Sequence, residues 1–86
     1  ERDFSKATDD AKEILGDMDI HPLAFSVVVE MVSQMGKESV SGFKNFLDAL
    51  KEGNYDKAAQ EMRDSRWGKQ TPKIADTLAK KMSSAS

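Results

Sequence analysis

Three side chains in this sequence have types that are suited to binding a ligand: Gln34, Arg66 and Trp67. The indole of Trp67, the only tryptophan, combines a flat apolar face with one N–H donor. The amide of Gln34 can donate and accept hydrogen bonds at once, and the planar guanidinium of Arg66 suits a bidentate contact with a carboxylate. These three residues are therefore our candidates for a binding site.

Each candidate also has a purely structural interpretation, which the sequence leaves open. Trp67 can be a packed aromatic residue of a small helical bundle, and Gln34 can be an exposed residue near a helix end. Arg66 can pair with Asp64 or Glu61 on the surface, a contact that contributes little to stability.

The other polar residues give no pattern for metal or cofactor chemistry. His21 is the only histidine and directly precedes Pro22, so we interpret it as a loop residue near a helix start. The absence of cysteine excludes disulfides and thiolate metal sites. An acidic cluster near the start lacks the spacing and the glycine of a calcium loop, and we interpret it as a solvated face. The cluster consists of Asp9, Asp10, Glu13, Asp17 and Asp19. We expect neither a metal ion nor a cofactor.

Composition indicates one globular domain and disfavours two classes of partner. Of 86 residues, 38% are hydrophobic and 33% are charged, which is typical of a folded domain. The net charge of −2 disfavours nucleic acid, because sequence-independent binding needs a basic surface. The longest apolar run, residues 23–32, is interrupted by Ser26 and Glu30 and is too short to span a bilayer. We expect no nucleic-acid or membrane partner.

The elements that must position the candidate residues are helices. Apolar residues at helical spacing predict a first helix that ends at Gly16, and Pro22 opens a second one that ends at Gly36. This second segment is apolar around most of its circumference, which is typical of a helix inside a bundle. Its three consecutive valines, residues 27–29, are also compatible with a strand, but its length and its end signals favour a helix. The apolar residues of the first helix are Phe4, Ala7, Ala11, Ile14 and Leu15.

The rest of the chain continues in short helical segments. We expect a helical turn at residues 38–40, a helix with an apolar stripe that stops at Gly53, and a helix over residues 55–63. A single turn at residues 66–70 carries two of the candidate residues, and Thr71 and Pro72 open the last helix. No strand pair appears, so the sequence predicts an all-α bundle of five to six short helices in one domain, residues 1–86.

The order and spacing of five short motifs resemble a known protein family. They are Gln34-Met35-Gly36, Gly42-Phe43, residues 55–59, Ser65-Arg66-Trp67 and Gln70-Thr71-Pro72. Together they are similar to the carboxy-terminal lobe of lysozymes of the T-even tailed-phage type, a family of phage endolysins and tail lysozymes. The resemblance implies that residues 22–82 form this lysozyme-like lobe and that residues 1–15 are a remnant of the helix that links the two lobes.

The same resemblance implies roles for the three candidate residues. Gln34 and Trp67 would lie side by side on the wall of the cleft between the lobes, where they would contact the glycan of peptidoglycan. Arg66 would reach an acidic residue of the amino-terminal lobe. The resemblance further implies a phage-encoded protein that acts in the host cytoplasm or periplasm, or in the virion. Its partners would be peptidoglycan, a missing amino-terminal catalytic lobe or another phage protein.

The resemblance does not extend to catalytic residues. Glycoside hydrolysis needs two acidic groups across the scissile bond, and this family carries them in the amino-terminal lobe, which no part of the chain resembles. We therefore expect no catalytic residue and no turnover by this chain alone. It begins with Glu1, not methionine, so we expect a fragment or a processed product. The alternative is a non-catalytic interaction or structural phage protein on the same scaffold.

Overall fold

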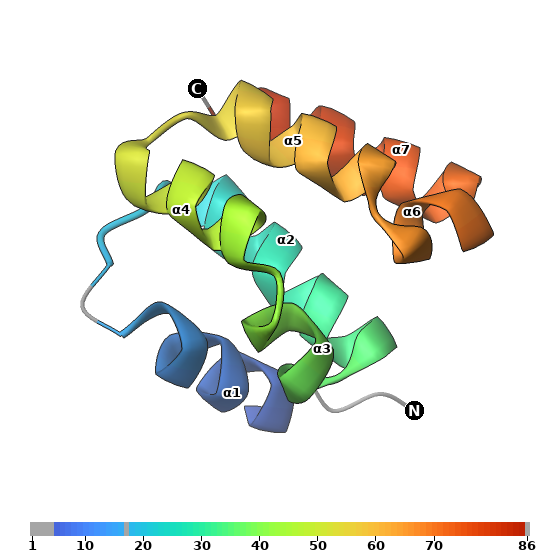
Figure 1. Ribbon diagram of the computed structural model, residues 1–86. Coiled ribbons are helices and arrows are strands. Elements are labelled where there is room, and N and C mark those ends of the chain that lie inside the picture. The colour runs from blue at the N-terminus through green and yellow to red at the C-terminus, as the bar shows by residue number, and fades with distance from the viewer. Residues whose placement is uncertain (1–4, 17, 86) are drawn as a thin grey trace.

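The computed structural model describes residues 5–16 and 18–85, and this part of the chain contains seven helices and no strand (Figure 1). The predicted all-α class is therefore confirmed. The turns expected at residues 38–40 and 66–70 are five-residue helices, which raises the count above the expected five to six. Phe4 and Asp17 lie outside the described residues. The helices are α1 (Ser5–Leu15), α2 (Pro22–Met35), α3 (Lys37–Ser41), α4 (Lys44–Glu52), α5 (Tyr55–Asp64), α6 (Arg66–Gln70) and α7 (Pro72–Ser83).

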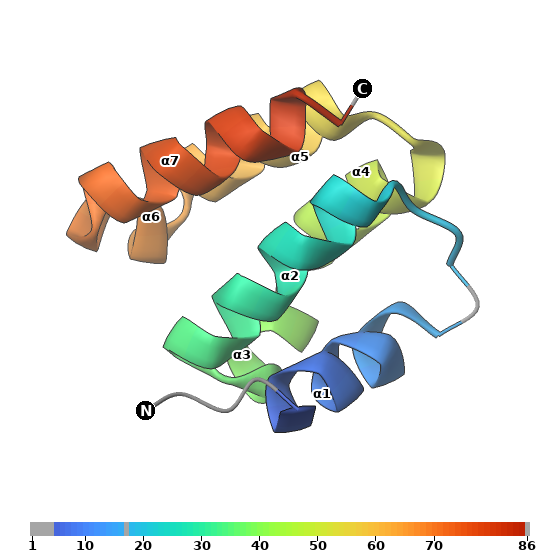
Figure 2. The ribbon, with the colours of Figure 1, turned by 180° about the vertical axis from the view of Figure 1, so that it is seen from behind.

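The helices pack in two groups around α2. On one side α2 contacts α1 and α3, and on the other side it contacts α7 (Figures 1 and 2). Helix α5 packs along α7 and also contacts α4, while the short helix α6 joins the ends of α5 and α7. Helix α6, which carries Arg66 and Trp67, is thus held by two longer helices.

Helix α2 forms where the sequence predicts it, so the segment with the three valines is a helix and not a strand. Pro22 occupies the first turn, and Nδ1 of His21 accepts a hydrogen bond from the backbone N–H of Leu23 at 3.1 Å. This cap satisfies one of the donors that a helix start leaves open, and it confirms His21 as a loop residue at a helix start. Gly36 ends the helix with φ of 90°, a conformation that glycine adopts without strain. The three valines at 27–29 are all buried in this helix.

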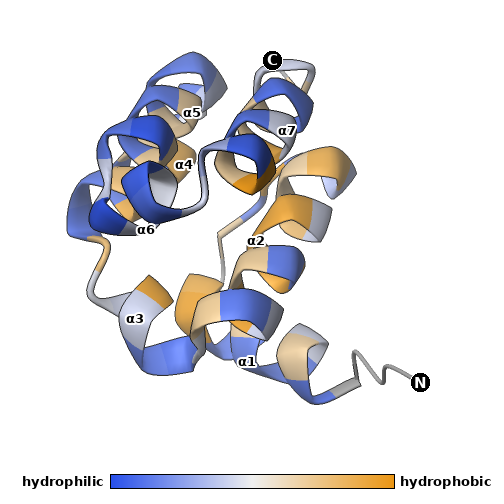
Figure 3. Cartoon of the chain, turned by 90° about the vertical axis from the view of Figure 1, so that its right-hand side faces the viewer, coloured by the Kyte–Doolittle hydropathy of each residue, from blue (hydrophilic) through white to orange (hydrophobic). Residues whose placement is uncertain are grey.

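The core is entirely apolar over the described residues, with no buried polar or charged side chain. Apolar residues of the helices turn inward and hydrophilic ones outward (Figure 3). Three methionines fill this core, as expected for a flexible side chain that adapts to irregular gaps. No helix among the described residues is long and apolar enough to cross a membrane. The largest fully buried side chains are Phe46, Met31, Leu50, Met62, Met82, Val27, Val28 and Val40.

An exposed ion-pair network ties α5 to α7. The carboxylate of Asp76 lies 3.1 Å from the guanidinium of Arg63 and 3.1 Å from the ammonium of Lys80. The hydrogen bond with Lys80 and the positive charges of Lys80 and Arg63 lower the pKa of Asp76 below its usual value of 3.8. Because the folded-state pKa is lowered, the stabilisation is present above the unfolded-state pKa and is lost as the pH falls through the folded-state pKa.

We therefore expect Asp76→Asn to lower the melting temperature at neutral pH and to lose this effect in acid. The difference from the parent chain should be constant well above the ordinary carboxyl pKa and should disappear as the pH falls through the lowered folded-state pKa of Asp76. Thermal melts followed by circular dichroism across this range measure it. Asp48→Asn is the matched control, because Asp48 is exposed and has no ion pair within the described part of the chain. A pH-independent difference for Asp76→Asn would contradict the assigned network.

Candidate ligand pocket at Trp67

The turn that carries Arg66 and Trp67 is fixed at both ends by hydroxyl groups. At its start, the Ser65 Oγ accepts a hydrogen bond from the Gly68 N–H at 2.9 Å and donates one to the Met62 carbonyl at 2.7 Å. At its end, the Thr71 Oγ1 donates to the Trp67 carbonyl at 2.8 Å. The Ser65 hydroxyl thus caps the start of α6 by accepting from the Gly68 N–H, and the two hydroxyl groups add bonds to the Met62 carbonyl of α5 and to the Trp67 carbonyl. The indole of Trp67 therefore projects from a well-anchored backbone.

Gly68 allows this turn to approach α5 closely. It is buried, and a Cβ atom built on it would lie 2.2 Å from the Met62 carbonyl oxygen and 2.8 Å from the Arg63 carbonyl oxygen. Both neighbours are backbone atoms that cannot rotate away. Gly68 is not among the residues that the sequence singles out, because its φ is ordinary and only the packing of α6 on α5 reveals its role.

Arg66 and Trp67 line a common pocket of about 330 Å³. Its apolar side comes from the partly buried residues Met35, Phe43 and Trp67, which pack against the core. Exposed polar groups complete it, among them Arg66 and Gln70, which lie four residues apart on α6 and so share one face. The pocket thus offers a flat apolar surface beside hydrogen-bond donors. Its full lining is Met35, Ser39, Phe43, Ser65, Arg66, Trp67 and Gln70.

Gln34 does not share this pocket. It is exposed near the end of α2 and lines a separate hollow of about 240 Å³, together with residues of α7. Consecutive residues of a helix point about 100° apart, so Met35 faces α6 while Gln34 faces α7. Among the described residues no hydrogen bond joins Gln34 to Trp67. The structure brings together two of the three candidates and adds Met35, Phe43 and Gln70.

The guanidinium of Arg66 is not engaged by its neighbours in sequence. Within residues 5–16 and 18–85 it forms no ion pair, neither with Asp64 nor with Glu61 nor with any other residue. It is exposed at the edge of the pocket. The group therefore remains available to an acceptor from outside.

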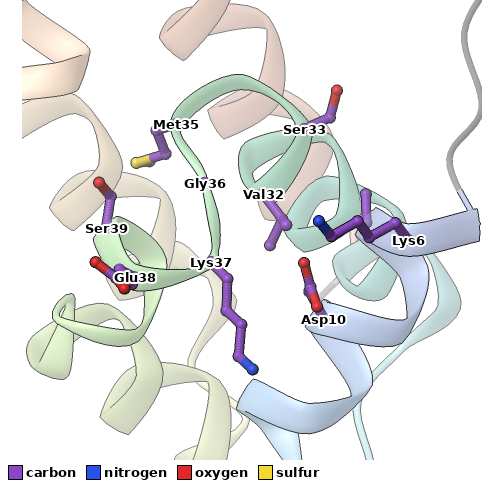
Figure 4. A pocket seen from close by; sticks show the side chains of 10 residues that line it. Lys6, Asp10, Val32, Ser33, Met35, Gly36, Lys37, Glu38 and Ser39 are labelled. Carbon is purple, nitrogen blue, oxygen red and sulfur yellow. The ribbon is translucent and has the colours of Figure 1, made fainter.

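A larger hollow, about 730 Å³, lies elsewhere, between α1, the end of α2 and α3 (Figure 4). Lys6 and Asp10 of α1 and Lys37 and Glu38 of α3 are among the residues that line it. The hydrogen bond from Lys37 to Glu13 raises the pKa of the Lys37 ammonium, so this cation stays charged. Two cationic and two carboxylate side chains line the hollow. No group of three potential metal ligands occurs in the described part of the chain.

The fold and the pocket thus define a small helical domain with a solvent-open pocket at its single tryptophan. Among the curated proteins whose sequences match are two from Dictyostelium discoideum, which is not a phage. "Probable T4-type lysozyme 2" is 44% identical over 51 residues, which are 59% of this chain and 30% of the relative. "Probable T4-type lysozyme 1" is 42% identical over 45 residues, which are 52% of this chain and 26% of the relative.

The chain is therefore related to T4-type lysozymes over about half of its length, as the motifs predict. It spans less than a third of the length of these two relatives. No family model and no solved structure matches it.

Proposed function

We propose that residues 22–82 form the carboxy-terminal lobe of a lysozyme-like muramidase and contact peptidoglycan through the Trp67 pocket. One observation carries the proposal: the indole of Trp67 and the guanidinium of Arg66, which has no ion pair among the described residues, line the same solvent-open pocket. An indole face packs against the apolar face of a sugar ring, and the guanidinium binds carboxylates. The relationship to T4-type lysozymes supports this ligand class.

The pocket itself supports binding and not cleavage. Glycoside hydrolysis uses a pair of Asp or Glu residues on either side of the scissile bond. None of the residues that line the Trp67 pocket is acidic. In this proposal the acids come from an amino-terminal lobe, Arg66 pairs with an acidic residue of that lobe, and α1 belongs to the connecting helix. The isolated chain then binds glycan without turning it over.

Gln34 takes a secondary part in this proposal. Because it lines the neighbouring hollow, it touches only a ligand that is long enough to extend beyond the Trp67 pocket. Removal of its amide should therefore weaken binding less than removal of the indole.

Titration of disaccharide-peptide fragments of cell wall into ¹⁵N-labelled protein tests the proposal. The Trp67 indole resonance should shift first, with a dissociation constant of about 1 mM or weaker, because one wall of a cleft buries little of the ligand. Trp67→Ala should abolish binding and Gln34→Ala should weaken it. Arg66→Ala should also weaken it, whereas the control Arg63→Ala should not, because Arg63 is engaged by Asp76 on another surface. An absence of shifts, or shifts confined to residues 9–19, would contradict the proposal.

A further inference from the structure

The Trp67 pocket contains one side chain that is open to oxidation, the thioether of Met35. Of the five methionines in the chain, only Met18 and Met35 are partly exposed. Met18 lies in the connection between α1 and α2 and is not among the residues that line the pocket. Met35 therefore combines access to solvent with a place in the candidate binding site. The three fully buried methionines are Met31, Met62 and Met82.

Met35 is reached by solvent from two hollows. It is the last residue of α2, and it lines both the Trp67 pocket of about 330 Å³ and the hollow of about 730 Å³ beside α1 and α3 (Figure 4). Ser39 of α3 also lines both, so the two hollows adjoin along these two side chains. A small oxidant in water therefore reaches Met35 in the folded chain, whereas a buried methionine reacts only when the structure opens.

Oxidation changes the chemical character of the pocket. Its apolar side consists of Met35, Phe43 and Trp67. In the reaction with hydrogen peroxide, the O–O bond breaks and one oxygen forms a bond to the sulfur, while the other oxygen keeps both protons and leaves as water. The sulfur is oxidised and the peroxide is reduced. The resulting sulfoxide is polar, so one of three apolar side chains becomes a polar group beside the indole.

We propose that Met35 is an oxidation site through which hydrogen peroxide converts the Trp67 pocket from an apolar to a polar surface. The change is reversible, because methionine sulfoxide reductases return the sulfoxide to the thioether. An oxidised pocket offers less apolar surface to the face of a sugar ring, so glycan binding should weaken on oxidation. This last consequence rests on the proposed function, whereas the modification of Met35 and its effect on the indole do not.

Treatment of the folded 86-residue chain with hydrogen peroxide tests the proposal. Peptide mapping by mass spectrometry locates each added oxygen as a gain of about 16 Da. Met35 should gain this oxygen more than about tenfold faster than the three buried methionines. The indole resonance of Trp67 should shift with the same time course and should return after treatment with the reductases. Far-ultraviolet circular dichroism should stay unchanged, and a loss of helix that accompanied the shift would overturn the proposal of a local change.

Met35→Leu and Met18→Leu form a matched pair of variants. Leucine keeps the volume and the apolar character of methionine but has no sulfur to oxidise. Met35→Leu should abolish the peroxide-dependent shift of the Trp67 resonance, whereas Met18→Leu should behave like the parent chain. A shift that persisted in Met35→Leu, or oxidation of Met35 as slow as that of the buried methionines, would overturn the proposal. A parent chain that showed the shift but bound no glycan before treatment would contradict the proposed function and leave the oxidation site supported.

Discussion

Replacement of Phe46 by alanine is expected to lower the free energy of unfolding by about 3–5 kcal/mol. Phe46 is the largest fully buried side chain, and its ring lies 5.4 Å from the ring of Phe43. Alanine would remove the ring from the centre of the bundle and leave a cavity that the surrounding helices fill only in part. A domain of this size is stable by about 4–13 kcal/mol in total, so the loss takes a large share of it.

Urea denaturation followed by circular dichroism measures this effect, and Phe43→Ala is the matched control. Phe43 is the same residue type three positions earlier, but it is only partly buried at the Trp67 pocket. Its replacement should therefore cost less stability than that of Phe46. If the two variants lost equal stability, the assigned position of Phe46 at the centre of the core would be wrong.

Gly68→Ala is expected to destabilise the fold by about 3 kcal/mol or more, although it adds only one methyl group. The new Cβ would lie 2.2 Å from the Met62 carbonyl oxygen, so α6 must move away from α5. This movement would break the hydrogen bond between the Gly68 N–H and Ser65 and would displace the indole of Trp67. Both the stability and the glycan affinity should fall together.

Gly42→Ala serves as the control for this substitution. At Gly42 an added Cβ would have its nearest neighbours at 3.6 Å and 3.7 Å, which is ordinary contact, and its φ of −79° suits alanine. This variant should melt close to the parent chain. A Gly68→Ala variant that melted equally high, with an unshifted Trp67 indole resonance, would contradict the close approach of α6 to α5.

Much of this fold is predictable because its helices carry strong end signals. Pro22 and Gly36 delimit α2, and Pro72 opens α7, so the position of each helix follows from local chemistry alone. The same end signals decide against a strand at the three valines. The burial of Phe46 and Leu50 likewise follows from their spacing on α4.

The neighbours of α2 could not be predicted in the same way. A helix that is apolar around most of its circumference has no single face that marks the core, so its sequence does not say which residue faces which partner. The resemblance to the phage lysozyme lobe implies that Gln34 lies beside Trp67, whereas in the structure Met35 lines the Trp67 pocket and Gln34 lines the hollow toward α7. The role of Gly68 also depends on how separate helices meet, which local patterns do not encode.

Because the chain has a single tryptophan, its intrinsic fluorescence reports on one part of the fold. Trp67 lies on α6, which packs mainly against α5 and α7, whereas α1 packs against α2 and α3 at the other side of the molecule. Intrinsic fluorescence therefore reports the opening of one end, while far-ultraviolet circular dichroism averages over all helices. Superposition of the two unfolding curves would show that both ends melt as one cooperative unit. An earlier fluorescence transition would assign the lowest local stability to the helix that bears the proposed binding site.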